Sequence, residues 1–271
     1  MPELPEVETI KRKMSPQIIG RSIQSVLFLY PPTLQAPTVE EFNKRVVGRR
    51  VVDIARRGKY LLLRLDSLDS LLVHLRMTGS FLIGPKEMAR TNHVSVVICF
   101  DGGICLYFTD PRRFAKFILV SDEQGALSNL GVEPLSASFT VSVLVSLLSG
   151  KSMAIKAFLM EQSIIAGIGN MYADEALFEA RLHPLRVAGS LSFEEADCLY
   201  RAIVCVLTQA IEKGGASVSD YSHPDGSKGK AQESFKVAHR KSGYCLECGG
   251  LIERITIRSR GTYYCPFCQR L

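Results

Sequence analysis

Hydrophobic residues recur at helical spacing at the start of the chain. The positions of residues 2–14 that fall on one helical stripe are Leu4, Val7, Ile10 and Met14. Pro5 suits the first turn of such a helix, where the backbone N–H has no partner in any case. The pattern predicts a helix that begins almost at the amino terminus and anchors it, although most chain termini fray.

From residue 21 to residue 120 the helical period gives way to short runs rich in β-branched and aromatic residues. These runs cover residues 22–30, 50–54, 60–65, 71–75, 94–100, 104–109 and 115–120. Asp101-Gly102-Gly103 separates two of them and is typical of a hairpin turn. Short strands with turns between them favour a two-layer β-sandwich over alternating strands and helices.

Helical spacing returns after a connecting segment, residues 121–137, which contains Gly125, Gly131 and Pro134. The segments with this spacing are 141–148, 153–162, 172–180 and the long amphipathic stretch 193–212. Residues 214–230 are rich in Gly, Ser and Asp, which is typical of a surface loop.

This succession of patterns predicts a multidomain α+β protein. Residues 1–134 would form a β-sandwich domain with an N-terminal helix, residues 135–235 a helical domain, and residues 236–271 a small β-ribbon domain. No apolar run reaches the ~18 residues of a membrane-spanning helix, and the first residues lack the basic and apolar regions of a secretory signal. We therefore expect a cytoplasmic protein.

The charge of the chain is concentrated near its end. The 271 residues carry a formal net charge of +6, and residues 236–271 contain seven Lys or Arg against two Glu. A Zn²⁺ ion held there by four thiolates would reduce the local charge by two. A basic tail favours an anionic partner such as nucleic acid, although many solvated surfaces have the same composition.

Eight cysteines fall into two groups. Cys245-x₂-Cys248 and Cys265-x₂-Cys268 are separated by sixteen residues, a spacing that lets four thiolates converge on one Zn²⁺ ion. Disulfides are disfavoured in a reducing compartment, and four protein ligands leave the metal no open position, so we expect a structural zinc. The remaining cysteines, which lie in apolar stretches and which we expect to be small buried side chains, are Cys99, Cys105, Cys198 and Cys205.

The second residue has distinctive chemistry. An initiator Met is normally removed when a small residue follows it, which would expose the secondary amine of Pro2. An α-amine titrates near about 8, against about 10.4 for Lys, so it is unprotonated roughly a hundredfold more often at neutral pH. Attack of this amine on a sugar C1′ would give an iminium ion, an electron sink for elimination. Glu3 could then move protons to the opening ring. By itself, however, the Pro-Glu dipeptide is also an ordinary start before a helix.

From MPELPEVETI onward the chain resembles the formamidopyrimidine-DNA glycosylase family, nearly end to end. The matching motifs, in chain order, are RRGKY (56–60), HLRMTG (74–79), DPRRF (110–114), GIGNMYADEALF (167–178), HP (183–184) and RGTYYCPFCQ (260–269). The residues that follow Glu3 resemble this branch more than the endonuclease VIII-like branch, whose members typically begin Pro-Glu-Gly-Pro-Glu.

The resemblance implies a catalytic set. Pro2 would be the Schiff-base nucleophile and Glu3 the acid/base. Lys59 would assist proton transfer during β-elimination and contact phosphate. Arg260 would help to expel the second phosphate in δ-elimination, a role that suits a permanently charged bidentate donor. Without the resemblance, Lys59 and Arg260 would be ordinary solvated residues.

It also implies contacts with DNA. Met77, Arg112 and Phe114 match residues that fill the space left by an extruded base, with a guanidinium facing the orphaned cytosine. On spacing alone, Met77 and Phe114 would be interpreted as core residues. His93 matches a phosphate-contacting position.

The segment Gly167–Asn170 resembles the turn of a helix-two-turn-helix element. Asn170 is an N-cap type of residue, and free N–H groups at a helix start bind phosphate; the alternative is a plain turn between helices. Lys156, on the preceding helix, would support the same grip on the DNA backbone.

Residues 214–230 correspond to the region that covers the extruded lesion in the family. The candidates for the lesion pocket are Glu6, Ser217, Ser219 and Tyr221. Glu6 could instead only favour the N-terminus of the first helix.

A few positions depart from the family pattern. Ser152 replaces a common basic residue, Ala238-His239 a common Tyr-Gly pair, and Ala115 a usual Gly. None of these changes removes a catalytic group, so they bear on DNA affinity and loop geometry.

The residues and the resemblance together predict a monomeric, bifunctional glycosylase/AP lyase in a bacterial type of cytoplasm. It would remove 8-oxoguanine or formamidopyrimidines from damaged double-stranded DNA and cut the strand by β,δ-elimination, with one structural Zn²⁺ and no nucleotide cofactor. One alternative is an oxidised-pyrimidine (endonuclease VIII-like) glycosylase/lyase with the same nucleophile, against which Leu4 and Met77 argue. Another is a non-catalytic nucleic-acid-binding protein with a zinc ribbon.

Overall fold

The computed structural model describes residues 1–86, 93–218 and 221–271. Contacts divide the chain into two compact units. The first comprises Met1–Ser128 together with Lys213–Lys230, and the second comprises Asn129–Glu212 together with Ala231–Leu271.

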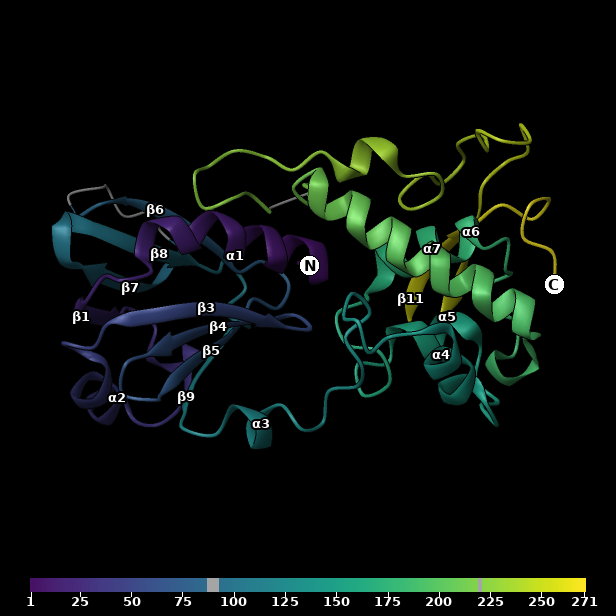
Figure 1. The fold of residues 1–271 in the computed structure, drawn as a ribbon. Coiled ribbons are helices and arrows are strands. Elements are labelled where there is room, and N and C mark those ends of the chain that lie inside the picture. The colour runs from purple at the N-terminus through teal and green to yellow at the C-terminus, as the bar shows by residue number, and fades with distance from the viewer. Residues whose placement is uncertain (87–92, 219–220) are drawn as a thin grey trace. The chain divides into compact units, whose positions relative to one another are not determined.

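Two sheets stack in the first unit and form the predicted β-sandwich (Figure 1). The antiparallel four-stranded sheet has the strand order β1 (Ile23–Phe28), β7 (Val94–Phe100), β8 (Ile104–Thr109) and β6 (Ser80–Pro85). The five-stranded sheet has the order β2 (Leu34–Ala36), β9 (Lys116–Val120), β5 (Ser70–His74), β4 (Tyr60–Leu65) and β3 (Val51–Arg57). In the second sheet β2 and β9 are parallel, and the other neighbours are antiparallel.

Aromatic rings from both sheets fill the space between them. The ring centroids of Phe81 and Phe108, in the four-stranded sheet, lie 4.9 Å apart, and Phe108 lies equally close, 4.9 Å, to Phe117 of β9. These rings meet edge to face, an arrangement that adds to the stabilisation from burial. Strands β5, β7 and β8 are buried along nearly their whole length, which matches the β-branched and aromatic runs that predicted them.

Helix α1 (Leu4–Ile18) packs against β3 and β4. Its predicted apolar stripe is fully buried, and each such side chain contributes roughly 1.5–3 kcal/mol. The helix continues beyond Met14 and through Pro16, because Ile18 adds another buried residue to the same stripe. The amino end of the chain is therefore held by packing and does not fray.

Several short elements of the first unit are not apparent in the sequence pattern. Strand β6 ends in Gly-Pro and pairs with β8 at the edge of its sheet, so its composition resembles a turn. Helix α2 (Val39–Val46) is too short for a helical period to stand out, although Thr38 caps it by accepting the Glu41 N–H at 3.3 Å. The other short elements of this unit are α3 (Glu123–Ala126) and 3₁₀ turns at Pro31–Thr33 and Asp101–Gly103; the second unit has 3₁₀ turns at Ala188–Ser190 and Ala231–Ser234.

The second unit contains the predicted helices and ribbon. Its helices are α4 (Val141–Leu148), α5 (Ile155–Met160), α6 (Asn170–Glu179) and α7 (Phe193–Glu212), and its antiparallel ribbon is β10 (Glu253–Ile257) with β11 (Arg260–Tyr264). Helix α7 packs on α4 and α6 through a buried stripe that includes Leu199, Ile203 and Leu207. None of the helices in the described residues combines the length and apolar character needed to cross a membrane.

Residues 213–230 lie with the first unit, whereas the sequence analysis assigned them to the helical domain. The backbone N–H of Ile83 donates to the Pro224 carbonyl at 2.8 Å, and the Lys13 ammonium lies 2.6 Å from the Asp225 carboxylate. A segment rich in Gly and Ser has no hydrophobic period, so its sequence does not reveal which unit it joins.

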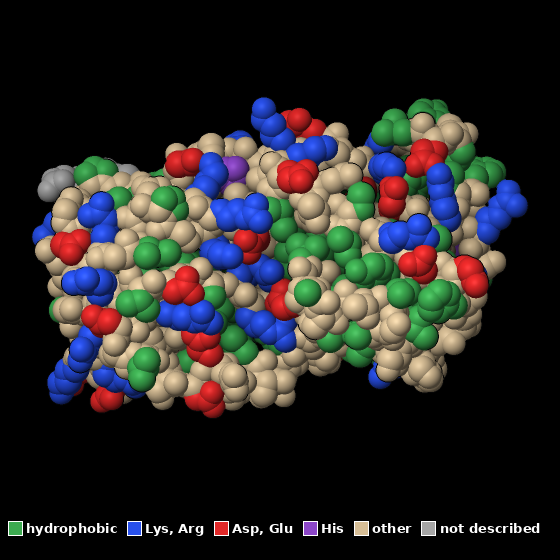
Figure 2. Space-filling model, in the orientation of Figure 1, with side chains coloured by type: hydrophobic (Ala, Val, Ile, Leu, Met, Phe, Trp, Pro, Cys, Tyr) green, Lys and Arg blue, Asp and Glu red, His purple; other side chains and the backbone are tan. Residues whose placement is uncertain are grey.

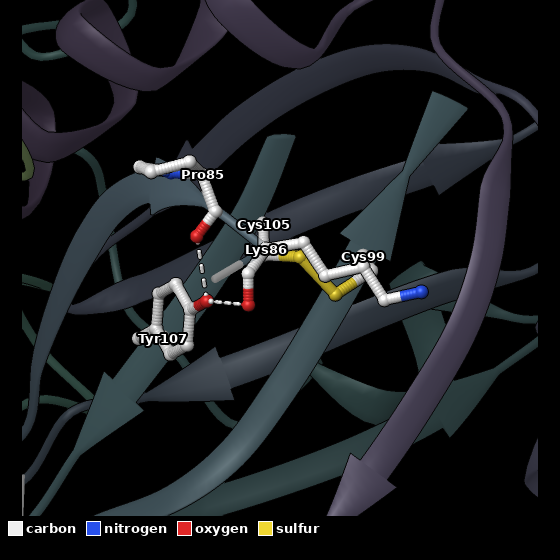
Figure 3. The surroundings of a disulfide bond; sticks show 5 residues. All are labelled: Pro85, Lys86, Cys99, Cys105 and Tyr107. Carbon is white, nitrogen blue, oxygen red and sulfur yellow. Dashed lines mark hydrogen bonds between the residues drawn. A yellow bond between two sulfur atoms is a disulfide. The ribbon is translucent and has the colours of Figure 1, made fainter. Parts of the chain in front are cut away.

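The cysteines outside the zinc pattern differ from the expectation. Cys198 and Cys205 are exposed on α7 and are not buried, so that prediction is wrong for both. Cys99 and Cys105 are buried as expected, but they form a disulfide between β7 and β8 (Figure 3). The hairpin register makes them direct partners, a relation that the composition of an apolar run does not show.

Tyr107 lies beside this disulfide on the same face of the sheet. Its hydroxyl donates to the backbone carbonyls of Pro85 and Lys86, at 2.8 and 3.0 Å (Figure 3). The disulfide therefore belongs to a small second apolar cluster that holds the end of β6 against β8.

Reduction of the Cys99–Cys105 disulfide should lower the free energy of unfolding by only about 2 kcal/mol, because the two residues are six positions apart and so short a loop removes little conformational freedom from the unfolded chain. Urea unfolding with and without a thiol reductant, at constant zinc, measures this change. Cys99→Ser is the control, since the reductant should have no effect on it. Unfolding of the first unit on reduction alone would contradict this account.

Candidate functional site

The amino end of the chain is fixed within the first unit. Pro2 and Glu3 are buried at the start of α1, and Glu3 is the N-cap residue. Glu3 and Glu6 form a capping box, in which the Glu3 N–H donates to the Glu6 carboxylate at 2.8 Å. The predicted nucleophile and acid/base therefore lie on a rigid element.

Lys59 lies in the tight turn between β3 and β4, after Gly58, whose φ of 55° favours glycine. Arg56 links this turn to α1: its guanidinium donates to the Gly58 carbonyl and, at 3.0 Å, to the Glu8 carboxylate. Lys59 is only 7% exposed, which excludes the interpretation of Lys59 as an ordinary solvated residue.

His74, at the end of β5, contributes to the site although the sequence analysis gave it no role. Burial, followed by the charges of Arg76, Lys59 and Lys116, lowers the pKa of His74 to about 3. The ring is therefore neutral, and its Nδ1 accepts the backbone N–H of Arg76 at 3.0 Å. This hydrogen bond shapes the next turn, where Arg76 has a φ of 56°. A single His carries no pattern by which the sequence could reveal this role.

The turn after β5 presents Met77 to solvent. It is closed by a hydrogen bond of 3.0 Å from the Gly79 N–H to the Leu75 carbonyl, and a Cβ on Gly79 would lie 2.4 Å from that oxygen. Met77 is 39% exposed and Phe114 is 53% exposed, which excludes the interpretation of both as core residues. The Arg112 Nη1 lies 3.4 Å from the Met77 sulfur.

Asp110 connects the segments that carry these side chains. Its backbone N–H donates to the His93 carbonyl at 3.0 Å, and its carboxylate accepts the Thr78 hydroxyl at 2.5 Å and the Ala115 N–H at 2.7 Å. Asp110 is 2% exposed, so these bonds lie in the interior, where hydrogen bonds to a charged group are strong. The structure thereby brings together the segments of four residues predicted to contact DNA: Met77, His93, Arg112 and Phe114.

Basic residues surround these turns. Figure 2 shows Lys and Arg side chains gathered on the visible face of the first unit, near the ends of β3 and β4. The basic residues of the turns described above are Arg57, Lys59, Arg76, Arg112 and Arg113. The Arg113 guanidinium also stacks over the Tyr30 ring, 4.6 Å from its centroid. A surface of this kind attracts the phosphates of a nucleic acid.

In the second unit, Arg260 is exposed at the first position of β11. It follows a two-residue turn, Arg258-Ser259, in which both residues have positive φ, as a type I′ hairpin requires. This turn projects the Arg260 end of the ribbon toward solvent.

Lys156, on α5, is 0% exposed. Its ammonium lies 2.7 Å from the Asp174 carboxylate and donates to the Thr262 hydroxyl at 2.8 Å and to the Gly261 carbonyl at 3.3 Å. Burial raises the pKa of Asp174 to about 7, although the Lys156 charge opposes this shift. The Lys156 charge is thus used inside the protein to hold the strand that begins with Arg260, and its predicted support of a grip on the DNA backbone stays a prediction.

Asn170 is the first residue of α6 and follows the N-cap Gly169, one position from the cap expected of it. Its Nδ2 donates to the Gly261 carbonyl at 3.0 Å, the same oxygen that Lys156 contacts. Two residues predicted to bind DNA thus meet at one backbone carbonyl beside Arg260.

Glu175 of α6 holds the chain that leads into the ribbon. Its buried carboxylate accepts the backbone N–H groups of Lys236, Val237 and Ala238 at 2.8, 2.9 and 2.7 Å. Burial raises the pKa of Glu175, whereas these three hydrogen bonds lower it. The departure from the family pattern at Ala238 is accommodated here, because Glu175 binds the backbone and not the side chain.

The four cysteines of the two Cys-x₂-Cys pairs converge as predicted. Their sulfur atoms all lie within 4.8 Å of one another, and the Cys245–Cys268 and Cys248–Cys265 separations are 3.8 and 3.4 Å. A tetrahedral zinc with Zn–S bonds of about 2.3 Å has S···S separations of about 3.8 Å. The donor set and its geometry fit one zinc ion.

The predicted lesion-pocket residues lie in the first unit. Tyr221 is buried in the core and donates its hydroxyl to the Glu6 carbonyl at 3.2 Å, and the Ser217 hydroxyl accepts the Gly229 N–H at 2.9 Å. Ser219 lies outside the described residues. A contact of Glu6, Ser217 or Tyr221 with a damaged base stays a prediction.

Family models match consecutive parts of the chain. They describe a formamidopyrimidine-DNA glycosylase N-terminal domain over residues 1–117, a formamidopyrimidine-DNA glycosylase H2TH domain over residues 130–222, and a zinc finger found in FPG and IleRS over residues 244–271. The chain belongs to the formamidopyrimidine-DNA glycosylase family. This membership confirms the resemblance and, with the fold, the predicted succession of sandwich, helix-two-turn-helix domain and zinc ribbon.

Relatives match over the whole length. A formamidopyrimidine-DNA glycosylase from Carboxydothermus hydrogenoformans is 43% identical over 100% of both chains, and one from Chloroflexus aurantiacus is 43% identical over 99% of this chain and 98% of its own. A Lactococcus lactis FPG variant, in complex with DNA that contains Fapy-dG, has a TM-score of 0.94 at 33% identity and 100% coverage of both chains. MutM from Thermus thermophilus has a TM-score of 0.89 at 40% identity, with 99% of this chain and 98% of that chain covered.

Because of His74, the free energy of unfolding of this protein should fall as the pH is lowered. In the folded state His74 stays neutral down to about pH 3, whereas the unfolded chain takes up this proton near 6.5, so a fall in pH below 6.5 favours unfolding. Proton linkage predicts that the free energy of unfolding falls by about 2 kcal/mol between about pH 7 and pH 5. The control variant is His74→Asn, whose side-chain carbonyl oxygen can replace Nδ1 as the acceptor. Between about pH 7 and pH 5, urea unfolding should show that the free energy of unfolding falls by about 2 kcal/mol more in the wild type than in the variant. An identical pH dependence in both proteins would contradict a His74 that is neutral in the folded state.

Removal of the metal should unfold the ribbon selectively. Metal analysis should find one zinc ion per chain, and a chelator should abolish hydrogen-exchange protection in residues 244–271 while α7 stays protected, because structural zinc supplies the folding energy of small ribbons. Cys265→Ser should lose the zinc, whereas Cys198→Ser, the matched change at an exposed cysteine, should keep it. Full protection of the ribbon in the metal-free protein is the result that this account does not allow.

Proposed function

We propose that this chain is a bifunctional DNA glycosylase/AP lyase of base excision repair, which excises oxidised purines and cuts the exposed strand. Its relatives are named formamidopyrimidine-DNA glycosylase, and similar solved structures hold DNA with Fapy-dG, an abasic site or an 8-oxo-G analogue. The observation that carries the proposal is the buried Pro2-Glu3 start of α1, in a chain that matches this family from end to end.

The first chemical step is assigned to the amino terminus. After removal of Met1, the Pro2 nitrogen attacks C1′ of the damaged nucleotide, the bond from C1′ to the base breaks, and the base leaves with a proton. The sugar ring opens as its oxygen takes a proton from Glu3, and an iminium ion joins Pro2 to C1′. The helix start favours this step because it holds the two residues in one geometry.

The iminium ion then acts as an electron sink. Loss of a C2′ proton breaks the bond between C3′ and its oxygen, and the phosphate on that oxygen leaves. Loss of the C4′ proton then breaks the bond between C5′ and its oxygen, so that both flanking strands end in phosphate. We assign proton transfer in the first elimination to Lys59, whose burial beside the neutral His74 suits a group that handles protons. Arg260 is assigned to the phosphate that leaves in the second elimination.

Base extrusion is assigned to the exposed turns of the first unit. Met77 and Phe114 provide apolar side chains to fill the vacated space, and Arg112, in contact with the Met77 sulfur, provides the guanidinium for the orphaned cytosine. His93 is assigned to a phosphate. These turns need no opening of the core to meet DNA, because they already project from it.

The proposed function also includes a structural role for the zinc and a location in the cell. The zinc held by the four cysteines stabilises the ribbon and takes no part in bond breaking, since its four ligands leave no open position. The bacterial relatives and the DNA substrate favour action in the cytoplasm, at the nucleoid.

Borohydride trapping tests the proposal. The processed protein should be trapped covalently on a duplex with 8-oxoguanine opposite cytosine, because reduction converts the iminium ion into a stable amine. A variant with an uncleaved residue before Pro2 should bind the same duplex without being trapped. Absence of a covalent product from the processed protein, with binding retained, would establish the non-catalytic alternative.

The substrate in the same assay separates the remaining alternatives. An oxidised-purine enzyme should be trapped faster on 8-oxoguanine than on an oxidised pyrimidine in the same sequence, and undamaged duplex is the control. Faster trapping on the oxidised pyrimidine would favour the alternative of an endonuclease VIII-like glycosylase/lyase.

A further inference from the structure

The Glu6 carboxylate joins two segments that are far apart in sequence. Its Oε2 accepts the backbone N–H of Glu3 at 2.8 Å, and its Oε1 accepts the backbone N–H of Ala216 at 2.7 Å. Glu6 is 1% exposed, so water does not compete for these bonds. Hydrogen bonds from N–H groups to a buried carboxylate are short and roughly twice as strong as those between neutral groups.

The chain around Ala216 follows the first turn of α1 closely. Gly215 has a φ of 73°, and a Cβ at this position would lie 2.8 Å from the Glu6 Oε1 and 3.2 Å from the Glu6 Cα. The Tyr221 hydroxyl donates to the Glu6 backbone carbonyl at 3.2 Å. A glycine at position 215 is therefore what allows the Ala216 N–H to reach the carboxylate.

The same segment is also attached to the first unit at places remote from Glu6. The Lys13 ammonium contacts the Asp225 carboxylate at 2.6 Å and the Ser227 hydroxyl at 3.0 Å, and the Ile83 N–H donates to the Pro224 carbonyl at 2.8 Å. Attachment of the segment therefore does not depend on Glu6 alone. What Glu6 adds is a link from this segment to the start of the chain.

That link acts on Pro2 through the geometry of one peptide bond. The Glu3 N–H belongs to the planar peptide group that also contains the Pro2 Cα, so a hydrogen bond that fixes the N–H direction fixes this plane. The Pro2 ring nitrogen is bonded directly to that Cα. One rotation, about the Cα–C bond of Pro2, is left to aim the amine.

We propose that Glu6 is a positioning residue for the Pro2 amine, and that residues 214–216 take part in this positioning by holding the second oxygen of the same carboxylate. The proposal rests on the function proposed above, because Pro2 is the nucleophile only in that reaction. It gives the contact of residues 214–216 with α1 a role in bond formation that is separate from any contact with a damaged base.

Glu6→Gln tests the proposal with little change in shape. A Gln side chain keeps one acceptor oxygen but places an NH₂ group against the other backbone N–H, so one arm of the link is lost. Gly215→Ala disturbs the other side, because its Cβ would meet the Glu6 side chain. The controls are Glu40→Gln, the same change at an exposed residue paired with Lys44, and Lys13→Met, which removes a remote attachment of the segment.

The measurement is single-turnover borohydride trapping on a duplex that carries an abasic site, at saturating protein, with Kd measured separately. An abasic site has no base to recognise, so the trapping rate reports the amine and not the lesion pocket. Glu6→Gln and Gly215→Ala should slow trapping about 10- to 100-fold, as expected for a misplaced nucleophile, with Kd within about threefold of wild type. Glu40→Gln and Lys13→Met should be trapped at the wild-type rate.

Each other outcome has one meaning. Trapping of Glu6→Gln at the wild-type rate, or a change in its Kd alone, overturns the positioning role and leaves the proposed function intact. Slow trapping by Lys13→Met to the same extent would show that general attachment of the segment matters and not the Glu6 link, which also overturns it. Failure of the wild type to be trapped at all removes the proposed function and this inference with it.

Discussion

The packing of α1 against β3 and β4 is the constraint on which the rest of the site depends. A nucleophile at the amino terminus has a single covalent connection to the protein, so the residues that follow it must fix its position. The buried stripe from Leu4 to Ile18 and the capping box of Glu3 with Glu6 supply that fixation. The same sandwich that anchors α1 also carries the turns with Lys59 and Met77, so one core sets the relative positions of these groups.

In both units, a buried polar residue forms hydrogen bonds to the segments that carry exposed side chains. Asp110 does this for the turns that carry Met77 and Phe114, and Lys156 does it for the strand that begins with Arg260. A buried charge is costly to desolvate, and it is tolerated here because each one is paired or hydrogen-bonded to several partners. The exposed side chains therefore stay accessible to solvent, while buried hydrogen bonds hold the backbone that carries them.

The local patterns of the sequence predicted much of the fold and the metal site. Burial of one helix face requires apolar residues at a regular period, and a four-thiolate zinc site requires a characteristic spacing of cysteines. Helix α7 and strands β7 and β8 match their predicted ranges to the residue. The contacts of Asp110, the inward-facing charge of Lys156 and the Cys99–Cys105 bond join residues that only the folded chain brings together, and no local period encodes them. The roles proposed for Pro2 and Arg260 rest on the family resemblance and not on a local pattern, since an ordinary helix start and an ordinary ribbon arginine have the same sequence.

Mass spectrometry of the borohydride-trapped complex tests the central claim most directly. After nuclease and protease digestion, the account predicts that the remnant of the sugar is attached to the nitrogen of Pro2, in a peptide that lacks Met1. A remnant attached to Lys59 or to any other lysine would contradict it.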